Sequence, residues 1–422
     1  MAKKTKGSGS VSSPPDRPKV SRAQKTREVQ EAITASALEL LAENGVDGLA
    51  LTKIATHAGM SNGPLYGRYD SAEDVALELW DGKLRDHFRR LILEFDAFAS
   101  SNDSEPSEWL LQELETPSAL TAAAIEVVAV ARRFPLLVDS VRDEVDSLFQ
   151  QICSRNPDIP PAICSLRLTV PTGCVVTSRS VPKTRPPWKR ILVQFRDSAL
   201  DPANLNQQGL KASPVLLPIP EPDTGDVGLD EFVSAVMEVV ARVGFEKTTA
   251  HRVARAAGHS FSSAYTHVGT KDELMHMAIG QMMSQIWQTG TASFLELGPD
   301  EYKAAIVALH VGLVAEANRP IRQLRTETTV AMRHHPDLAA AGRKRTAASL
   351  AIVLDAVEKA DPAATEDAAA FWYLTMASGM GTVTLSLLTG TFRHTDWTPV
   401  AAIAYDMAFA TTIEPLSKLP KA

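Results

Sequence analysis

The sequence predicts an all-α protein that consists of two tandem copies of one helical unit. The composition is that of a globular protein, with 45% hydrophobic and 22% charged residues, and apolar residues recur at helical spacing. Residues 40–75 align without a gap on residues 239–274, and seven of the 36 aligned pairs are identical. A repeat of this kind indicates a duplicated structural unit. The stretch 201–228 between the copies contains five prolines and is expected to be an extended linker.

The chain begins with a basic segment. Residues 1–30 carry eight Lys and Arg against two acidic residues, whereas the whole chain has a net charge of −7. Gly, Ser and Pro lie between these charges, so we expect residues 1–21 to form a disordered basic arm. Such an arm can bind nucleic-acid phosphates, and a solvated tail without a partner is the alternative.

Three helices are expected at the start of the first copy. Apolar residues at helical spacing predict a helix that ends at Gly45, and a second helix over 51–58. Gly59 then supplies a positive φ for a tight turn, and Ser61 is expected to cap a short third helix over 62–69.

This order of elements is the pattern of a helix-turn-helix, whose second helix enters the major groove of DNA. An αα corner without a DNA role has the same pattern and is the alternative. Ser71-x-x-Asp74 predicts a capping box at the start of a fourth helix, and Thr270-x-x-Glu273 repeats it in the second copy.

The same residues resemble a known family. The run IATHAGMSNGPLYGRYDSAEDV at 54–75 is similar to the helix-turn-helix of TetR-family transcriptional regulators, and VARAAGHSFSSAYTHVGTKDEL at 253–274 resembles a second, degenerate copy. The resemblance implies that each unit has a three-helix DNA-binding part followed by a larger helical part that binds a ligand and dimerises. The segments that follow are a disordered basic arm (1–21), a first helix-turn-helix domain (22–72), a first ligand and dimerisation domain (73–200), the linker (201–228), a second, degenerate helix-turn-helix domain (229–271) and a second ligand and dimerisation domain (272–422).

The resemblance places the DNA contacts of the first copy on its helix-turn-helix and on the end of the basic arm. These residues are Arg22, Lys25, Arg27, Thr52, Lys53, Ser61, Asn62, Gly63, Pro64, Tyr66 and Arg68. Asn62 and Arg68 can read base edges, whereas the hydroxyl groups of Ser61 and Tyr66 suit phosphate oxygens.

The second copy offers a similar set of DNA contacts, namely Arg252, Ser260, Ser262, Tyr265, His267 and Lys271. Lys271 stands where the family usually has a phosphate-binding lysine and the first copy has Ala72. Tyr69 occupies the family's core aromatic position, which is Val268 in the second copy. Residues 221–231 are acidic where a binding arm would be basic, so it stays open whether this copy contacts DNA.

The similarity continues downstream. Arg132, Arg133 and Pro135 match Arg333, His334 and Pro336, and residues 169–173 match residues 375–379. By the resemblance, residues 166–177 and 187–200 of the first copy, and 368–392 and 399–412 of the second, are dimerisation helices. We expect the two copies to pair within one chain as a pseudo-dimer, with a homodimer as the alternative.

A small apolar effector is expected in the helical core of the second copy. Its predicted lining consists of Trp287, His310, Phe371, Trp372 and Tyr373. Residues 368–392 carry no charge, but interspersed Ser, Thr and Gly favour a buried helix over a membrane span.

Other function classes find little support in the sequence. The three cysteines lack the spacing of a zinc site and suggest a reducing cytoplasm, and we predict no metal and no cofactor. No phosphate loop or nucleophile elbow is present, so an enzyme is not expected. The sequence thus predicts a DNA-binding, ligand-responsive transcriptional regulator. The resemblance to the TetR family implies that it is a repressor. The alternative is a helical ligand-binding or protein-interaction module whose DNA-binding parts have decayed.

Overall fold

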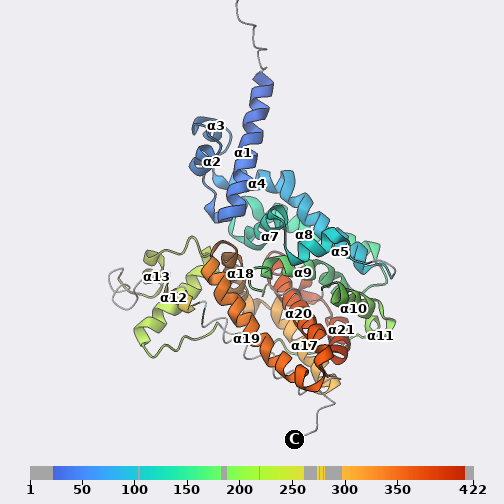
Figure 1. The fold of residues 1–422 in the computed structure, drawn as a ribbon. Coiled ribbons are helices and arrows are strands. Elements are labelled where there is room, and N and C mark those ends of the chain that lie inside the picture. The colour runs from blue at the N-terminus through green and yellow to red at the C-terminus, as the bar shows by residue number, and fades with distance from the viewer. Residues whose placement is uncertain are drawn as a thin grey trace, which may run out of the picture.

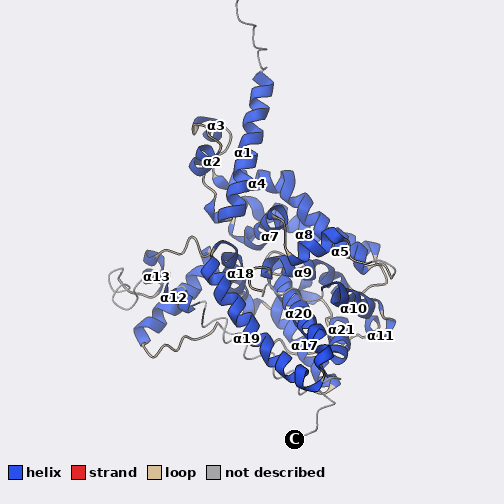
Figure 2. Ribbon diagram, in the orientation of Figure 1, coloured by secondary structure: helices blue, strands red, loops and turns tan. Residues whose placement is uncertain are grey.

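The fold is known from a computed structural model, which describes residues 22–102, 105–181, 188–217, 219–260, 273–274, 276–278, 280 and 297–413. All regular secondary structure in these ranges is helical (Figure 2), which confirms the predicted all-α class.

The first copy starts with three helices that project from the main body and continues into that body (Figure 1). Gly45 ends its first helix with a φ of +72°, as predicted. The helices are α1 (Arg22–Asn44), η1 (Val46–Gly48), α2 (Leu51–His57), α3 (Gly63–Tyr66), α4 (Ala72–Leu79), η2 (Trp80–Leu84), α5 (Arg85–Ala99), α6 (Glu108–Glu115), α7 (Ala119–Val130), η3 (Ala131–Arg133), α8 (Pro135–Arg155), α9 (Pro161–Thr177) and α10 (Trp188–Leu200).

The C-terminal half, which the sequence predicts to be the second copy, has its first described helices on a different side of the body (Figure 1). Its described helices are α12 (Val227–Val243), α13 (Ala250–Ala256), α17 (Pro299–Val314), η4 (Glu316–Asn318), α18 (Arg319–His334), α19 (Pro336–Ala360), η5 (Pro362–Ala364), α20 (Thr365–Leu385), η6 (Thr391–His394), α21 (Thr398–Ala408) and η7 (Phe409–Ile413). The helix predicted over 368–392 therefore ends early. The hydroxyl of Thr389 accepts from the backbone N of Thr391 and donates to Asp146 of α8, so these bonds hold the irregular segment that follows α20.

The two copies meet where α9 packs against α20. A Cβ on Gly173 would lie 1.7 Å from the carbonyl oxygen of Ala377, and a Cβ on Gly381 would lie 1.8 Å from that of Thr169. The helices can approach this closely only because both positions are glycine. The contact is reciprocal, since Gly173 and Gly381 are 208 positions apart, as are Thr169 and Ala377.

One continuous hydrophobic core runs through both copies. It includes Leu41 and Phe88 of the first copy, Trp372 and Trp397 of the second, and Leu168 of α9 at the contact between them. A second cluster joins α12 and α13 to α18 and α19, with Phe232 and Leu324 among its members. The first DNA-binding part is thus continuous with the main core, whereas α12 and α13 have a core of their own.

The segment between the copies is partly helical. Asp201 accepts from the backbone N of Ala203 and starts a short helix, α11 (Pro202–Leu205), where the sequence predicts only extended chain. The following residues do run extended. Val215 donates to the carbonyl of Ala308 in α17 at 3.1 Å and accepts from the side chain of Asn318 at 2.7 Å, so the linker packs against the second copy.

In the part of the chain that the structure describes, no single helix is both long and apolar enough to cross a membrane. One bent pair, Glu108–Glu115 with Ala119–Arg133, meets that test by length and composition.

Candidate nucleic-acid interface and central cavity

The predicted helix-turn-helix is formed by α2, a tight turn and α3. Gly59 has a φ of +65°, and the backbone N of Met60 bonds to the carbonyl of Ala55 at 3.0 Å, which closes the turn. Ile54 and Leu65 are fully buried and anchor the two helices to each other and to α1. The second helix is therefore held rigidly on its inner side.

The expected cap of α3 is wrong. Ser61 does not cap this helix, which begins at Gly63 with Asn62 as its N-cap residue and without a side-chain hydrogen bond. A side-chain cap at Ser61 would bond to the backbone N–H two or three residues later, and Pro64 removes the second of these donors. Pro64 instead fits the first turn of the helix.

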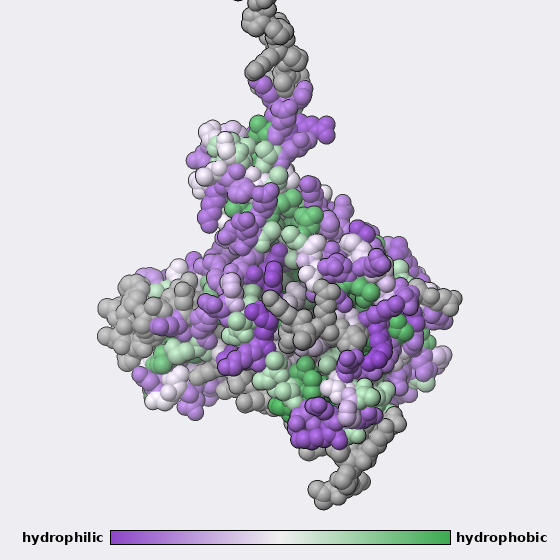
Figure 3. Space-filling model, in the orientation of Figure 1, coloured by the Kyte–Doolittle hydropathy of each residue, from purple (hydrophilic) through white to green (hydrophobic). Residues whose placement is uncertain are grey.

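The outer side of this motif presents most of the predicted DNA contacts to solvent. The exposed members are Lys25, Arg27, Thr52, Lys53, Ser61, Asn62, Gly63, Tyr66 and Arg68, while Pro64 is half-buried. The Tyr66 side chain is 57% exposed although it is aromatic. The surface along α1 is mostly hydrophilic (Figure 3). The side chain of Arg22 lies outside the described residues.

Tyr69 packs as predicted instead of facing solvent. Its hydroxyl donates to Glu78 at 2.8 Å and accepts from Gln30 at 2.6 Å, which ties α1 to α4. Burial raises the pKa of Tyr69 to about 12. The predicted capping box is also confirmed, because Ser71 and Asp74 exchange both bonds at the start of α4. These contacts fix the motif against the body of the first copy.

The second copy keeps the first part of the motif. His259 N bonds to the carbonyl of Ala254 at 2.9 Å, Gly258 has a φ of +74°, and Thr249 caps α13. The turn therefore has the same geometry as in the first copy. Of the residues predicted to contact DNA, Arg252 is half-buried and Ser260 is exposed. Four further predictions, Ser262, Tyr265, His267 and Lys271, lie outside the described residues.

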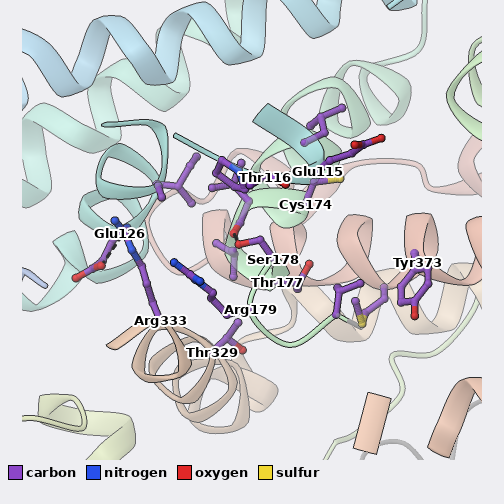
Figure 4. A pocket seen from close by; sticks show the side chains of 18 of the residues that line it. Glu115, Thr116, Glu126, Cys174, Thr177, Ser178, Arg179, Thr329, Arg333 and Tyr373 are labelled. Atoms are coloured by element: carbon purple, nitrogen blue, oxygen red, sulfur yellow. Dashed lines mark hydrogen bonds and ion pairs between the residues drawn. The ribbon is translucent and has the colours of Figure 1, made fainter. Parts of the chain in front are cut away.

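A cavity of about 420 Å³ lies between the two copies (Figure 4). Its wall combines the start of α7, the end of α9, and residues of α18, α19 and α20. Apolar side chains on it include Ile125, Cys174, Val175, Trp188 and Met376. Burial raises the pKa of the Cys174 thiol, so the thiol stays protonated and forms an apolar part of the wall.

Among the described residues of the predicted effector lining, only Tyr373 lies on this wall. Phe371 and Trp372 are buried among other core residues. His310 packs 5.0 Å from the ring of Trp397 and bonds to the carbonyl of Ile306, and burial lowers its pKa, so it is neutral. Trp287 lies outside the described residues.

Two buried ion clusters join the copies beside this cavity. Glu126 of α7 lies 3.2 Å from Arg333 and 2.7 Å from His334 at the end of α18. Glu327 of α18 lies 2.6 Å from Arg132 and 2.9 Å from Arg133 at the end of α7. The clusters are equivalent, because all three pairs differ by 201 positions: Glu126 and Glu327, Arg132 and Arg333, Arg133 and His334.

Each cluster reaches the end of the first helix of a DNA-binding part, and does so across the copies. His334 of the second copy bonds to the carbonyl of Glu43 in α1 at 3.0 Å. Arg133 of the first copy donates to the carbonyl of Val243 in α12 at 2.9 Å and pairs with Asp47 at 2.8 Å. The first cluster thus contacts the end of α1, and the second contacts the end of α12 and, through Asp47, the segment after α1. The repeat in the sequence identified the cationic residues but not their glutamate partners.

No cluster of three or more His, Cys, Asp or Glu side chains in the described ranges could hold a metal ion.

Residues 33–79 match the family described as bacterial regulatory proteins, tetR family. The matched segment covers most of α1, the helix-turn-helix and α4. No curated protein matches the chain. The family match supports a DNA-binding transcriptional regulator.

Proposed function

We propose that this protein is a cytoplasmic, ligand-responsive transcriptional repressor in which two TetR-like units pair within a single chain. The observation that carries the proposal is the helix-turn-helix at 51–66, which lies inside the matched segment and presents Asn62 and Tyr66 to solvent, as does Arg68 two residues after it. The reciprocal contacts of α9 with α20 support the pairing, because a symmetric dimer buries equivalent residues against each other.

The cavity supports the ligand response. It is lined by residues of both copies and adjoins Glu126, whose carboxylate bonds to the backbone N of Val46 directly after α1. A ligand that binds one arrangement of these residues better than another would shift the DNA-binding parts and so change operator affinity.

Two measurements test the proposal. Binding to the gene's own upstream DNA is expected to weaken steeply with salt, because phosphate contacts release counterions. Light scattering is expected to give the mass of one chain, 45.6 kDa, at dilute concentration. A mass of twice that value would replace the pseudo-dimer by a homodimer. Absence of salt-dependent binding would leave a helical module with decayed DNA-binding parts.

A further inference from the structure

The wall of the central cavity carries an excess of positive charge. Arg179, Arg333 and Arg343 line it, whereas Glu115 and Glu126 are its only carboxylates among the described residues. The guanidinium of Arg343 also donates to the carbonyl of Arg179, which brings two of the arginine residues together.

Glu126 cannot neutralise this charge well, because closer donors already occupy both of its oxygens. Oε1 accepts from the backbone N of Val46 at 2.9 Å. Oε2 lies 2.7 Å from Nε2 of His334, whose other ring nitrogen faces the carbonyl of Glu43. The ring of His334 thus bridges Glu126 and the backbone at the end of α1.

Arg333 is left short of acceptors. Its Nη1 lies 3.2 Å from Oε2 of Glu126, but this atom is buried and has no hydrogen-bond partner in the described part of the chain. Burial lowers the pKa of Arg333, Glu126 raises it and Arg179 lowers it further. An arginine nevertheless stays charged in proteins. Arg333 therefore lies on the wall of the open volume with one buried donor atom, Nη1, that has no partner in the described part of the chain.

The rest of the wall is suited to an apolar group. Ile125, Val175 and Met376 line it, and Arg333 and Tyr373 lie toward opposite ends of the view in Figure 4. We propose that the cavity binds a small amphipathic carboxylate, which pairs with Arg333 in place of Glu126 and lays its apolar part against these aliphatic side chains. A planar carboxylate matches the paired donors of a guanidinium.

This ligand class deepens the proposed function and rests on it for its effect on DNA. Once the ligand's carboxylate pairs with Arg333, Glu126 no longer contacts this arginine. Of its two side-chain partners from the second copy, only His334 then remains. Glu126 supports the backbone directly after α1, so the first DNA-binding part would be held less firmly in its DNA-binding arrangement. The ligand would then lower operator affinity.

The first test compares octanoate with octan-1-ol, which has the same chain length but no charge, by titration calorimetry on the full chain. Octanoate is expected to bind at least about tenfold more tightly, because it adds charge-assisted hydrogen bonds. Arg333→Gln is expected to abolish this preference, and Arg333→Lys to retain part of it. Equal affinity of the two probes for the wild-type protein, or no binding of octanoate, would overturn the proposal.

The second test uses the competition that the proposal requires. Glu126→Gln removes the competing charge and is expected to tighten octanoate binding several-fold, whereas removal of an ordinary supporting residue would weaken it. Glu327→Gln is the matched control, since it opens the equivalent cluster, which does not line the cavity, and is expected to leave octanoate affinity unchanged. Melting by circular dichroism checks that each variant is folded. Weaker binding by a folded Glu126→Gln protein would contradict the competition.

DNA affinity measured on the same samples separates the two proposals. Octanoate that binds with the expected preference to a protein without DNA affinity would refute the proposed function and support the ligand class. A protein that binds DNA but shows no preference for octanoate would refute the ligand class alone.

Discussion

Two tyrosine residues of the helix-turn-helix have different roles although they are three positions apart. Tyr66 is 57% exposed, whereas Tyr69 is buried and bonded to Gln30 and Glu78. The sequence could predict this difference, because the family pattern marks position 69 as a core aromatic position. It could not predict the start of α3 correctly, since cap preferences favoured Ser61 and the missing N–H of Pro64 decided the outcome.

The same substitution at these two positions is therefore expected to change two different properties, DNA affinity at position 66 and stability at position 69. Tyr66→Phe removes a hydroxyl that can reach a phosphate, and should cost about 0.5–1.5 kcal/mol of DNA affinity without a change in stability. Tyr69→Phe leaves Glu78 and Gln30 without their shared partner, and should cost about 1–3 kcal/mol of unfolding free energy. Fluorescence anisotropy with operator DNA and urea denaturation measure the two quantities. A loss of stability in Tyr66→Phe would remove Tyr66 from the DNA-binding surface.

At the scale of elements, the sequence located the helices that meet but not their register. Residues 169–173 align with 375–379, which pairs Gly173 with Gly379 at an offset of 206. The contacts instead relate Gly173 to Gly381 at an offset of 208. Small residues occur throughout both segments, so a sequence alignment cannot distinguish registers that differ by two positions. The backbone contacts distinguish these registers, because only one glycine of each helix, Gly173 or Gly381, lies where the helices cross.

Two alanine substitutions in α20 test this register. Gly381→Ala would place a methyl group 1.8 Å from the carbonyl oxygen of Thr169, so the helices must separate, at a cost of about 1–3 kcal/mol or more. Gly379→Ala is the matched control, because its nearest neighbour, Cδ1 of Leu313, is 3.9 Å away. The control should be neutral or stabilised by up to about 1 kcal/mol through better helix propensity. Thermal unfolding compares the two, and equal melting temperatures would be inconsistent with the described crossing.

At the scale of the whole molecule, the sequence predicted the class of fold better than the position of the cavity. The described aromatic residues of the predicted effector lining pack mainly against one another and the core, as Trp372 does with Tyr373 at 5.3 Å. The cavity is instead formed by side chains from both copies that lie far apart in the chain, such as Ile125 and Met376. Such a wall depends on how the copies pair, which no local pattern in one copy encodes.

The pairing of two unequal copies also predicts an asymmetric operator. Two identical recognition helices require a palindrome, whereas here the predicted contact positions share only Ser61 with Ser260 and Tyr66 with Tyr265. Arg68→Ala is expected to cost about 1–3 kcal/mol and to relax base preference in one half-site only. Lys271→Ala should lower affinity for all sequences alike and reduce the salt slope by about one unit, as loss of a phosphate contact does.

Footprinting and selection from a randomised operator measure both effects. Equal protection of a perfect palindrome, with both half-sites relaxed by Arg68→Ala, would require two copies of the first helix-turn-helix on the DNA and hence two chains. An unchanged salt slope in Lys271→Ala would mean that the second copy makes no phosphate contact there. The salt slope thus counts phosphate contacts in the second copy, and the half-site preference shows which recognition helix reads the bases.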